Sequence, residues 1–228
     1  MEENRKKRPI WKKLGIVLVV IACIAAGLYA YLFTGEKADG TGADIIRGDD
    51  GTRTLVVYFS RSDNMAMDDE TDITASASLN LDGTQIMGNT EIVAHIIRQK
   101  TDADLYPIRV STKYREAFMA TAGRAWIEET FNMRPKLAGS PISLDDYDVI
   151  YVGYPIWWFN APMAVGSFLE QYDLSGKTII PFATSEDNGI AISMDYINEI
   201  CKEADIREGI MANRMSKEDI EAWIEKVD

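Results

Sequence analysis

Hydroxyl and amide side chains follow the first apolar run of the chain and recur where a helix is expected to begin. The run at residues 54–59 (TLVVYF) leads into residues 60–64 (SRSDN), and residues 88–90 (GNT) open a segment with helical spacing. Hydroxyls and backbone N–H groups at a helix N-terminus bind phosphate without a lysine. The same residue types also cap ordinary helices. The pattern therefore indicates either a phosphate site or a plain helix cap.

Aromatic side chains gather after the second apolar run. Residues 148–153 (DVIYVG) are followed by residues 154–162 (YPIWWFNAP), which hold four aromatic residues. Such a cluster is costly to leave exposed and favours a flat hydrophobic ligand or a partner surface. The alternative is packing onto the helices of the same domain.

Small polar residues follow the third apolar run. Residues 178–182 (TIIPF) lead into residues 183–189 (ATSEDNG), where Gly189 ends the polar stretch. A loop of this composition lets its backbone approach a ligand, or it forms an ordinary turn.

Strands and helices alternate five times along this part of the chain. Alternation of short apolar strands with amphipathic helices predicts an α/β fold, with a parallel sheet covered on both faces. Pro107 favours an edge position for its strand. In such sheets ligands bind beyond the carboxyl ends of the strands, so the three loops should meet. We expect strands at 54–60, 104–110, 148–153, 178–182 and 206–211, and helices at 89–100, 114–130, 162–171, 189–202 and from 216 onward.

Composition excludes several classes of protein. With 228 residues, 46% of them hydrophobic, the chain is long enough for one domain with a substantial core. A net charge of −12 argues against nucleic-acid binding. Two cysteines and one histidine exclude a disulfide framework and a Cys/His zinc site. We expect no metal and no catalytic acid or nucleophile, with His95 on a polar helix face and Cys201 in the core.

The N-terminal region predicts a membrane anchor. Residues 1–13 hold six basic and two acidic residues, and residues 14–33 carry no charge over 20 positions. That length spans a bilayer as a helix, and the positive-inside bias puts residues 1–13 in the cytoplasm and the domain outside. Two alternatives are a lipoprotein anchored at Cys23 and a cleaved signal peptide. Residues 34–53 are Gly/Asp-rich and predict a flexible linker to the domain at 54–228.

The three loops together resemble those of the flavodoxin family, in a variant whose phosphate loop is interrupted. The motifs are LVVYFSRSDN with a delayed GNTE, then YDVIYVGYPIWW…AP, then GKTIIPFATS, and the resemblance spans residues 54–228. It implies a three-layer sandwich with a five-stranded parallel sheet of order 2-1-3-4-5, and FMN as the non-covalent cofactor.

The resemblance also implies which residues bind FMN. Ser60, Ser62, Gly88, Asn89 and Thr90 would hold the phosphate, with Arg61 at the rim. The isoalloxazine ring would lie against Pro155, Ile156, Trp157, Trp158, Phe159 and Asn160, and the other wall would be Thr184, Ser185 and Gly189.

Three departures from the family pattern stand out. Asp63 occupies a place where related loops often have glycine, and an aspartate near a phosphate is unfavourable unless it points away. Residues 65–87 form an insertion, interpreted as a flap with a hairpin arm at 73–81. Residues 186–188 replace a stretch that is often richer in glycine.

Three functional hypotheses follow. The first is a membrane-anchored FMN protein that transfers electrons to a redox partner protein or a small-molecule acceptor. The second is an NAD(P)H-dependent quinone or nitro reductase of the same fold. The third is a non-redox surface protein that has lost FMN and binds a partner through its aromatic loop.

Overall fold

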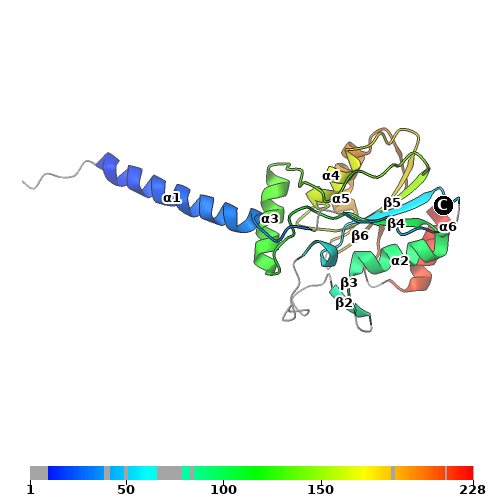
Figure 1. Ribbon diagram of the computed structural model, residues 1–228. Helices are drawn as coiled ribbons and strands as arrows, with labels where there is room; N and C mark the ends of the chain where they lie inside the picture. The colour runs from blue at the N-terminus through cyan, green and yellow to red at the C-terminus, as the bar shows by residue number, and fades with distance from the viewer. Residues whose placement is uncertain are drawn as a thin grey trace, which may run out of the picture.

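The computed structural model describes residues 10–38, 42–48, 51–65, 79–82, 85–185, 188–213 and 215–227 (Figure 1). Its main sheet has the order β4-β1-β5-β6-β7, with β8 also paired to β6, and every pairing in it is parallel. The predicted strand order is confirmed. The strands are β1 (Thr54–Tyr58), β4 (Asp104–Pro107), β5 (Val149–Pro155), β6 (Thr178–Thr184), β7 (Asp205–Ile206) and β8 (Ile210–Met211).

The expected fifth strand at 206–211 is divided into β7 and β8. Both parts pair with β6. The Arg207 N–H donates to the Ile179 carbonyl, and the Ala212 N–H donates to the Ala183 carbonyl. Pro181 lies between them on β6 and has no N–H to donate, so pairing is interrupted opposite this residue.

Helices cover both faces of the sheet. α2 (Asn89–Thr101) and α6 (Lys217–Val227) pack on one face, and α4 (Met163–Leu169) and α5 (Ala191–Ile200) on the other. Alternate residues of β1 enter the two cores, which is the arrangement expected of a strand buried on both faces.

α3 (Phe118–Thr130) lies at one end of the domain, beside the end of α1 (Figure 1). It begins four residues later than expected, because Tyr114 is held in an extended segment. The Tyr114 N–H donates to Asn64 O at 2.8 Å. The Tyr114 hydroxyl donates to Glu128 Oε2 at 2.7 Å.

α1 (Ile10–Phe33) projects from the domain, and its segment Leu14–Phe33 is long and apolar enough to cross a membrane. Only its last turn contacts the domain. There Leu32 is buried against Gly123 of α3.

Part of the expected linker is packed on the domain. Ile46 exchanges two backbone hydrogen bonds of 2.9 Å with Leu105 of β4. Arg47 Nη1 donates to Asp104 Oδ2 at 2.7 Å, and the Gly48 N–H donates to Asp104 Oδ1 at 2.7 Å. Residues 42–48 therefore cover β4, which is the edge strand of the sheet. This confirms the edge position predicted for the strand that contains Pro107.

A short 3-10 helix, η1 (Ser62–Asn64), follows β1. An antiparallel hairpin of β2 (Leu79–Asp82) and β3 (Gln85–Gly88) then leads directly into α2. The hairpin lies later than the expected arm at 73–81, of which residues 73–78 lie outside the described residues.

Candidate functional site

The predicted phosphate residues come together at the carboxyl ends of β1 and β6 and at the first turn of α2. Thr90 and Thr184 are 94 residues apart, and their hydroxyl oxygens lie 2.8 Å from each other. Ser60 Oγ and Ser62 Oγ lie 2.6 Å apart. Ser60, Thr90 and Thr184 are all buried. The fold therefore gathers four hydroxyls from three segments at the N-terminus of one helix. Helix N-termini bind phosphate through their free backbone N–H groups and the helix dipole.

Gly88 brings the backbone close to these hydroxyls. Its N–H donates to Ser62 Oγ and to Glu91 Oε2, both at 3.1 Å. A Cβ at position 88 would collide with Ser60 Oγ, so a larger residue would displace this hydroxyl.

Glu91 is a member of this cluster that the sequence analysis did not identify. Its carboxylate accepts a hydrogen bond from Ser62 Oγ at 3.0 Å, in addition to the one from the Gly88 N–H. The signal was available, because a glutamate three residues after Gly88 occupies the capping-box position. Burial, and then the neighbouring charge of Asp63, raise the pKa of Glu91.

Asp63 is held by a cation. Its Oδ1 accepts a hydrogen bond from Arg109 Nη2 at 3.3 Å. Burial raises the pKa of Asp63, and Arg109 partly offsets this effect.

Arg61 is buried and not at the rim of the site. Its Nη2 donates to the carbonyl of Glu116 at 2.6 Å, whereas its Nε has no partner among the described residues. Burial lowers the pKa of Arg61, and the side chain places a poorly solvated cation within the loop that follows β1.

The aromatic loop divides into an inner and an outer part. The ring of Trp157 packs edge-on against Phe59 and Tyr114, with centroid distances of 5.2 and 5.0 Å. Trp158 and Phe159 are exposed. Trp157 thus packs within its own domain, although on Phe59 and Tyr114 rather than on a helix, whereas the exposed rings of Trp158 and Phe159 remain candidates for a ligand or a partner surface.

Backbone geometry fixes the outer part of this loop. Trp157 and Asn160 exchange backbone hydrogen bonds of 2.9 and 3.1 Å across a tight turn. Trp158 has a φ of 58°, a left-handed conformation that is strained for a tryptophan. Its indole Nε1 donates to the carbonyl of Ala122 in α3 at 3.0 Å.

Thr184 links the aromatic loop to the hydroxyl cluster. Pro155 is paired with Thr184 in the sheet, and the Ile156 N–H donates to the Thr184 carbonyl at 2.9 Å. The two predicted halves of the site therefore share one strand end.

The third loop is positioned by a residue that the sequence analysis did not identify. The Ser185 N–H donates to Asn213 Oδ1 at 2.9 Å, and the Asn188 N–H donates to Ser185 Oγ at 3.2 Å. Gly189 lies just before α5. Residues 186 and 187, part of the stretch singled out for its lack of glycine, lie outside the described residues.

The remaining titratable candidates lie elsewhere. Cys201 is buried, as expected, and burial raises the pKa of its thiol to about 12. His95 is half-buried where exposure was expected, and burial lowers its pKa. Among the described residues, no group of three or more His, Cys, Asp or Glu side chains is arranged to hold a metal ion.

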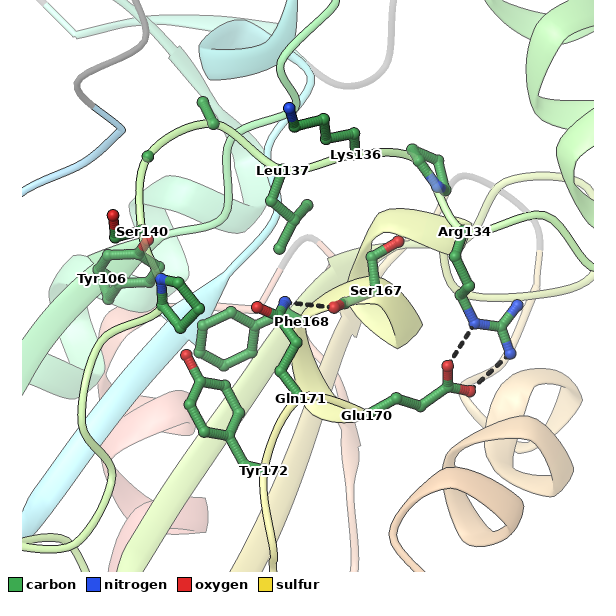
Figure 2. A pocket seen from close by; sticks show the side chains of 14 residues that line it. Tyr106, Arg134, Lys136, Leu137, Ser140, Ser167, Phe168, Glu170, Gln171 and Tyr172 are labelled. Atoms are coloured by element: carbon green, nitrogen blue, oxygen red, sulfur yellow. Dashed lines mark hydrogen bonds and ion pairs between the residues drawn. The ribbon is translucent and has the colours of Figure 1, made fainter.

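A cavity of about 470 Å³ lies away from these strand ends, between the loop at 134–141 and the C-terminal end of α4 (Figure 2). Arg134 and Glu170 form a two-pronged ion pair at one side of it, at 2.6 and 2.7 Å. Its lining contains none of the residues predicted to bind the cofactor.

Comparison with known proteins identifies the family. The family model described as Flavodoxin matches residues 84–227. The chain belongs to the flavodoxin family. No curated protein matches this flavodoxin-family chain.

Solved structures of similar proteins agree with this assignment. A putative flavoprotein from Bacteroides uniformis is 30% identical, with a TM-score of 0.61, and the match covers 77% of this chain and 99% of that protein. A putative flavoprotein from Bacteroides eggerthii is 28% identical, with a TM-score of 0.60 and coverage of 77% and 97%. A flavoprotein from Lactobacillus acidophilus, solved in complex with FMN, is 19% identical over 70% and 91% of the two chains, with a TM-score of 0.52. It supports the fold alone.

Proposed function

We propose that this flavodoxin-family chain is a membrane-anchored redox protein that binds FMN and transfers electrons. The observation that carries the proposal is the meeting of the hydroxyl cluster and the aromatic loop at one strand end, through Thr184. Similarity to two putative flavoproteins supports a flavin as the cofactor.

The hydroxyl cluster fits the phosphate of FMN. Ser60, Ser62 and Thr90 would donate to phosphate oxygens in place of their present mutual hydrogen bonds. Gly88 provides the close backbone approach, and the N-terminus of α2 favours an anion. The buried Nε of Arg61, without a partner among the described residues, supplies a nearby positive charge.

The aromatic loop fits the isoalloxazine ring. Residues 155–160 offer a rigid wall, because Trp157 is fixed by its neighbours and the turn is closed by hydrogen bonds. When bound, FMN supplies the redox chemistry, and the protein orients the ring and controls its access to water.

The N-terminal helix fits a membrane anchor. Six basic residues precede the apolar segment, so the positive-inside rule places the N-terminus in the cytoplasm and the domain outside. The partner would be a redox protein or a small-molecule electron acceptor that meets the domain on that side.

The full-length chain, purified in detergent from the membrane fraction, tests the proposal. We expect flavin absorption that stays with the protein through gel filtration, is bleached by dithionite and returns in air. A mass equal to that of the uncleaved and unlipidated chain would exclude a signal peptide and a lipid at Cys23. Rapid oxidation of NADH or NADPH would instead identify a reductase, and a protein without flavin that does not take up added FMN would contradict the proposal.

A further inference from the structure

We propose that the outer face of α3, together with Trp158 and Phe159, lies on the surface of the lipid bilayer. This inference rests on the membrane anchor of the proposed function and adds an orientation of the domain. The ring end of the candidate site would then face the lipid.

The face is apolar and exposed. Met119 is 76% exposed and Trp126 50% exposed, and Ala122 and Gly123 lie between them at helical spacing. Of the three charged residues of this helix, Arg124 and Glu128 are buried, and Glu129 is half-buried at the edge of the face. A surface helix normally presents the opposite pattern, with charges outward.

Further apolar side chains are exposed at the ends of α3 and in the neighbouring aromatic loop. Phe118 and Phe131, at the two ends of the helix, are 56% and 70% exposed. Phe159 is 63% exposed, and Trp158 is tied to α3 through its hydrogen bond to Ala122. Aromatic side chains of this kind are enriched where proteins meet the membrane–water interface.

The end of the apolar helix lies at the same level as α3. The uncharged segment of 20 residues ends at Phe33 and matches the hydrocarbon thickness of a bilayer, about 30 Å. Tyr29, Tyr31 and Phe33 cluster in its last turns, which is typical of the interfacial aromatic belt. Leu32, in this same turn, packs on Gly123 of α3.

Contacts at this point fix the angle between the anchor and the domain. Arg115 Nε donates to the carbonyl of Tyr31 at 2.6 Å, and its Nη2 donates to the carbonyl of Thr34 at 2.8 Å. The Arg115 guanidinium also lies 4.1 Å from the centre of the Tyr31 ring. α3 runs across the axis of α1 in Figure 1, so it lies along the membrane surface when α1 crosses the bilayer.

The occupant of the face follows from this geometry. A face directed toward the bilayer in which its own anchor is inserted is covered by lipid before a second protein can reach it. The net charge of −12 gives no electrostatic attraction to anionic lipids, so apolar contact must hold the face in place. We therefore expect the contact to form on zwitterionic lipid and to persist at high salt.

Site-specific fluorescence in vesicles tests the orientation. The full chain carrying Cys23→Ser and Met119→Cys is labelled with a polarity-sensitive dye and reconstituted in phosphatidylcholine vesicles, with or without spin-labelled lipid. Cys201 is buried and is not expected to react in the folded protein. The matched control is Ala222→Cys, an exposed position on α6 at the opposite end of the domain in Figure 1.

The expected result is loss of most dye emission at position 119 to the spin-labelled lipid and no loss at position 222. Flotation of the vesicles after an alkaline wash tests the anchor separately. A chain that floats, with equal quenching at both positions, overturns the orientation and leaves the anchor intact. A chain that does not float overturns both. A dye at position 119 that is shielded from aqueous iodide but untouched by the lipid label shows that a protein covers the face, and this also overturns the proposal.

A second variant separates apolar contact from proximity caused by the tether. Trp126→Glu, added to the protein labelled at position 119, should release the dye from lipid, because a carboxylate is costly to bury in the interface. Ala222→Glu in the same background should leave quenching unchanged. Quenching that survives Trp126→Glu would mean that the anchor alone holds the dye near the membrane, and the proposal would fail.

Discussion

The two ends of the candidate site are built in opposite ways. At the phosphate end, Ser60, Thr90 and Thr184 are buried, Ser62 is half-buried, and their hydroxyls are bonded to one another or to Glu91. At the ring end, large aromatic side chains are fixed by packing and by a strained turn, and two of them are exposed. A phosphate must therefore exchange hydrogen bonds that already exist, whereas a flat ring gains by covering apolar surface. We expect the ring end to supply most of the affinity and the phosphate end to select FMN over riboflavin.

The largest expected effect is on the free energy of unfolding, and it comes from the buried ion pair that supports the ring end. Trp157 packs on Tyr114, whose hydroxyl donates to Glu128, and Glu128 Oε1 pairs with Arg124 Nε at 2.7 Å. Arg124→Met leaves the buried Glu128 carboxylate without its cation and should reduce the free energy of unfolding by about 3–5 kcal/mol. Urea unfolding of the full chain in detergent, followed by circular dichroism, measures this loss.

Two controls define the effect of Arg124→Met. Glu128→Gln in the same background should recover part of the stability, because no unpaired charge remains. Lys100→Met removes the exposed pair with Glu225 and should change little. Equal losses for the buried and the exposed pair would contradict the account of the ring end.

Thr90→Val should separate the two ends most clearly. Loss of one hydroxyl donor to a charged phosphate costs about 1.5–3 kcal/mol, or about tenfold to a hundredfold in the Kd for FMN. The Kd for riboflavin should stay the same, because riboflavin has no phosphate. Thr101→Val, at the other end of α2, is the matched control. A parallel loss for both flavins in a folded Thr90→Val protein would place the phosphate elsewhere.

Trp158→Ala and Trp158→Gly test the strained turn at the ring end. Both remove the indole, but only glycine adopts a φ of 58° without strain. The glycine variant should be more stable than the alanine variant by about 1–2 kcal/mol. Thermal unfolding of the two proteins measures the difference. Equal stabilities would show that the turn relaxes once the indole is gone.

The smallest expected effect is a dependence of FMN binding on pH. Burial raises the pKa of Glu91, so this group gains a proton in the folded protein at a higher pH than in the unfolded chain. Its contribution to stability is complete below the unfolded pKa and is lost as pH rises through the folded pKa. Lowering the pH through this range also removes a negative charge beside the phosphate, so FMN should bind more tightly by about 1 kcal/mol, or about fivefold.

Glu91→Gln should remove this contribution and bind FMN more tightly at neutral pH. Fluorescence titrations of both proteins between acidic and neutral pH measure the difference. Protonation of the phosphate itself affects both proteins equally and cancels in the comparison. An identical pH dependence in the variant would exclude Glu91 as its source.

Much of the fold follows from local patterns in the sequence. Apolar runs bounded by polar loops predicted the strands and a parallel sheet, whereas the order of the strands was implied by the resemblance to the flavodoxin family. The strand ends indicated where Ser60, Thr90 and Thr184 would meet. The division of the fifth strand into β7 and β8 could not be predicted from its own residues. The cause is Pro181, which lies in the neighbouring strand β6. Local patterns cannot provide this information.

The site was harder to predict wherever long-range packing decides the position of a side chain. Trp157 and Trp158 are neighbours of the same type, yet one packs inward and the other is exposed, because a left-handed turn separates them. Arg61 reads as a surface cation but is buried through its contact with the Glu116 carbonyl. Asn213 reaches Ser185 from a distant loop, a contact that spacing does not reveal.

The most direct test of the central claim is a paired titration of the purified full chain with FMN and riboflavin, followed by quenching of flavin fluorescence. If the ring end supplies most of the affinity, the fluorescence of both flavins should be quenched. If the phosphate end selects FMN, FMN should bind at least about tenfold more tightly than riboflavin, because phosphate hydrogen bonds add about 1.5–3 kcal/mol. No quenching of either flavin would contradict the account, and equal affinities would show that the hydroxyl cluster does not bind the phosphate.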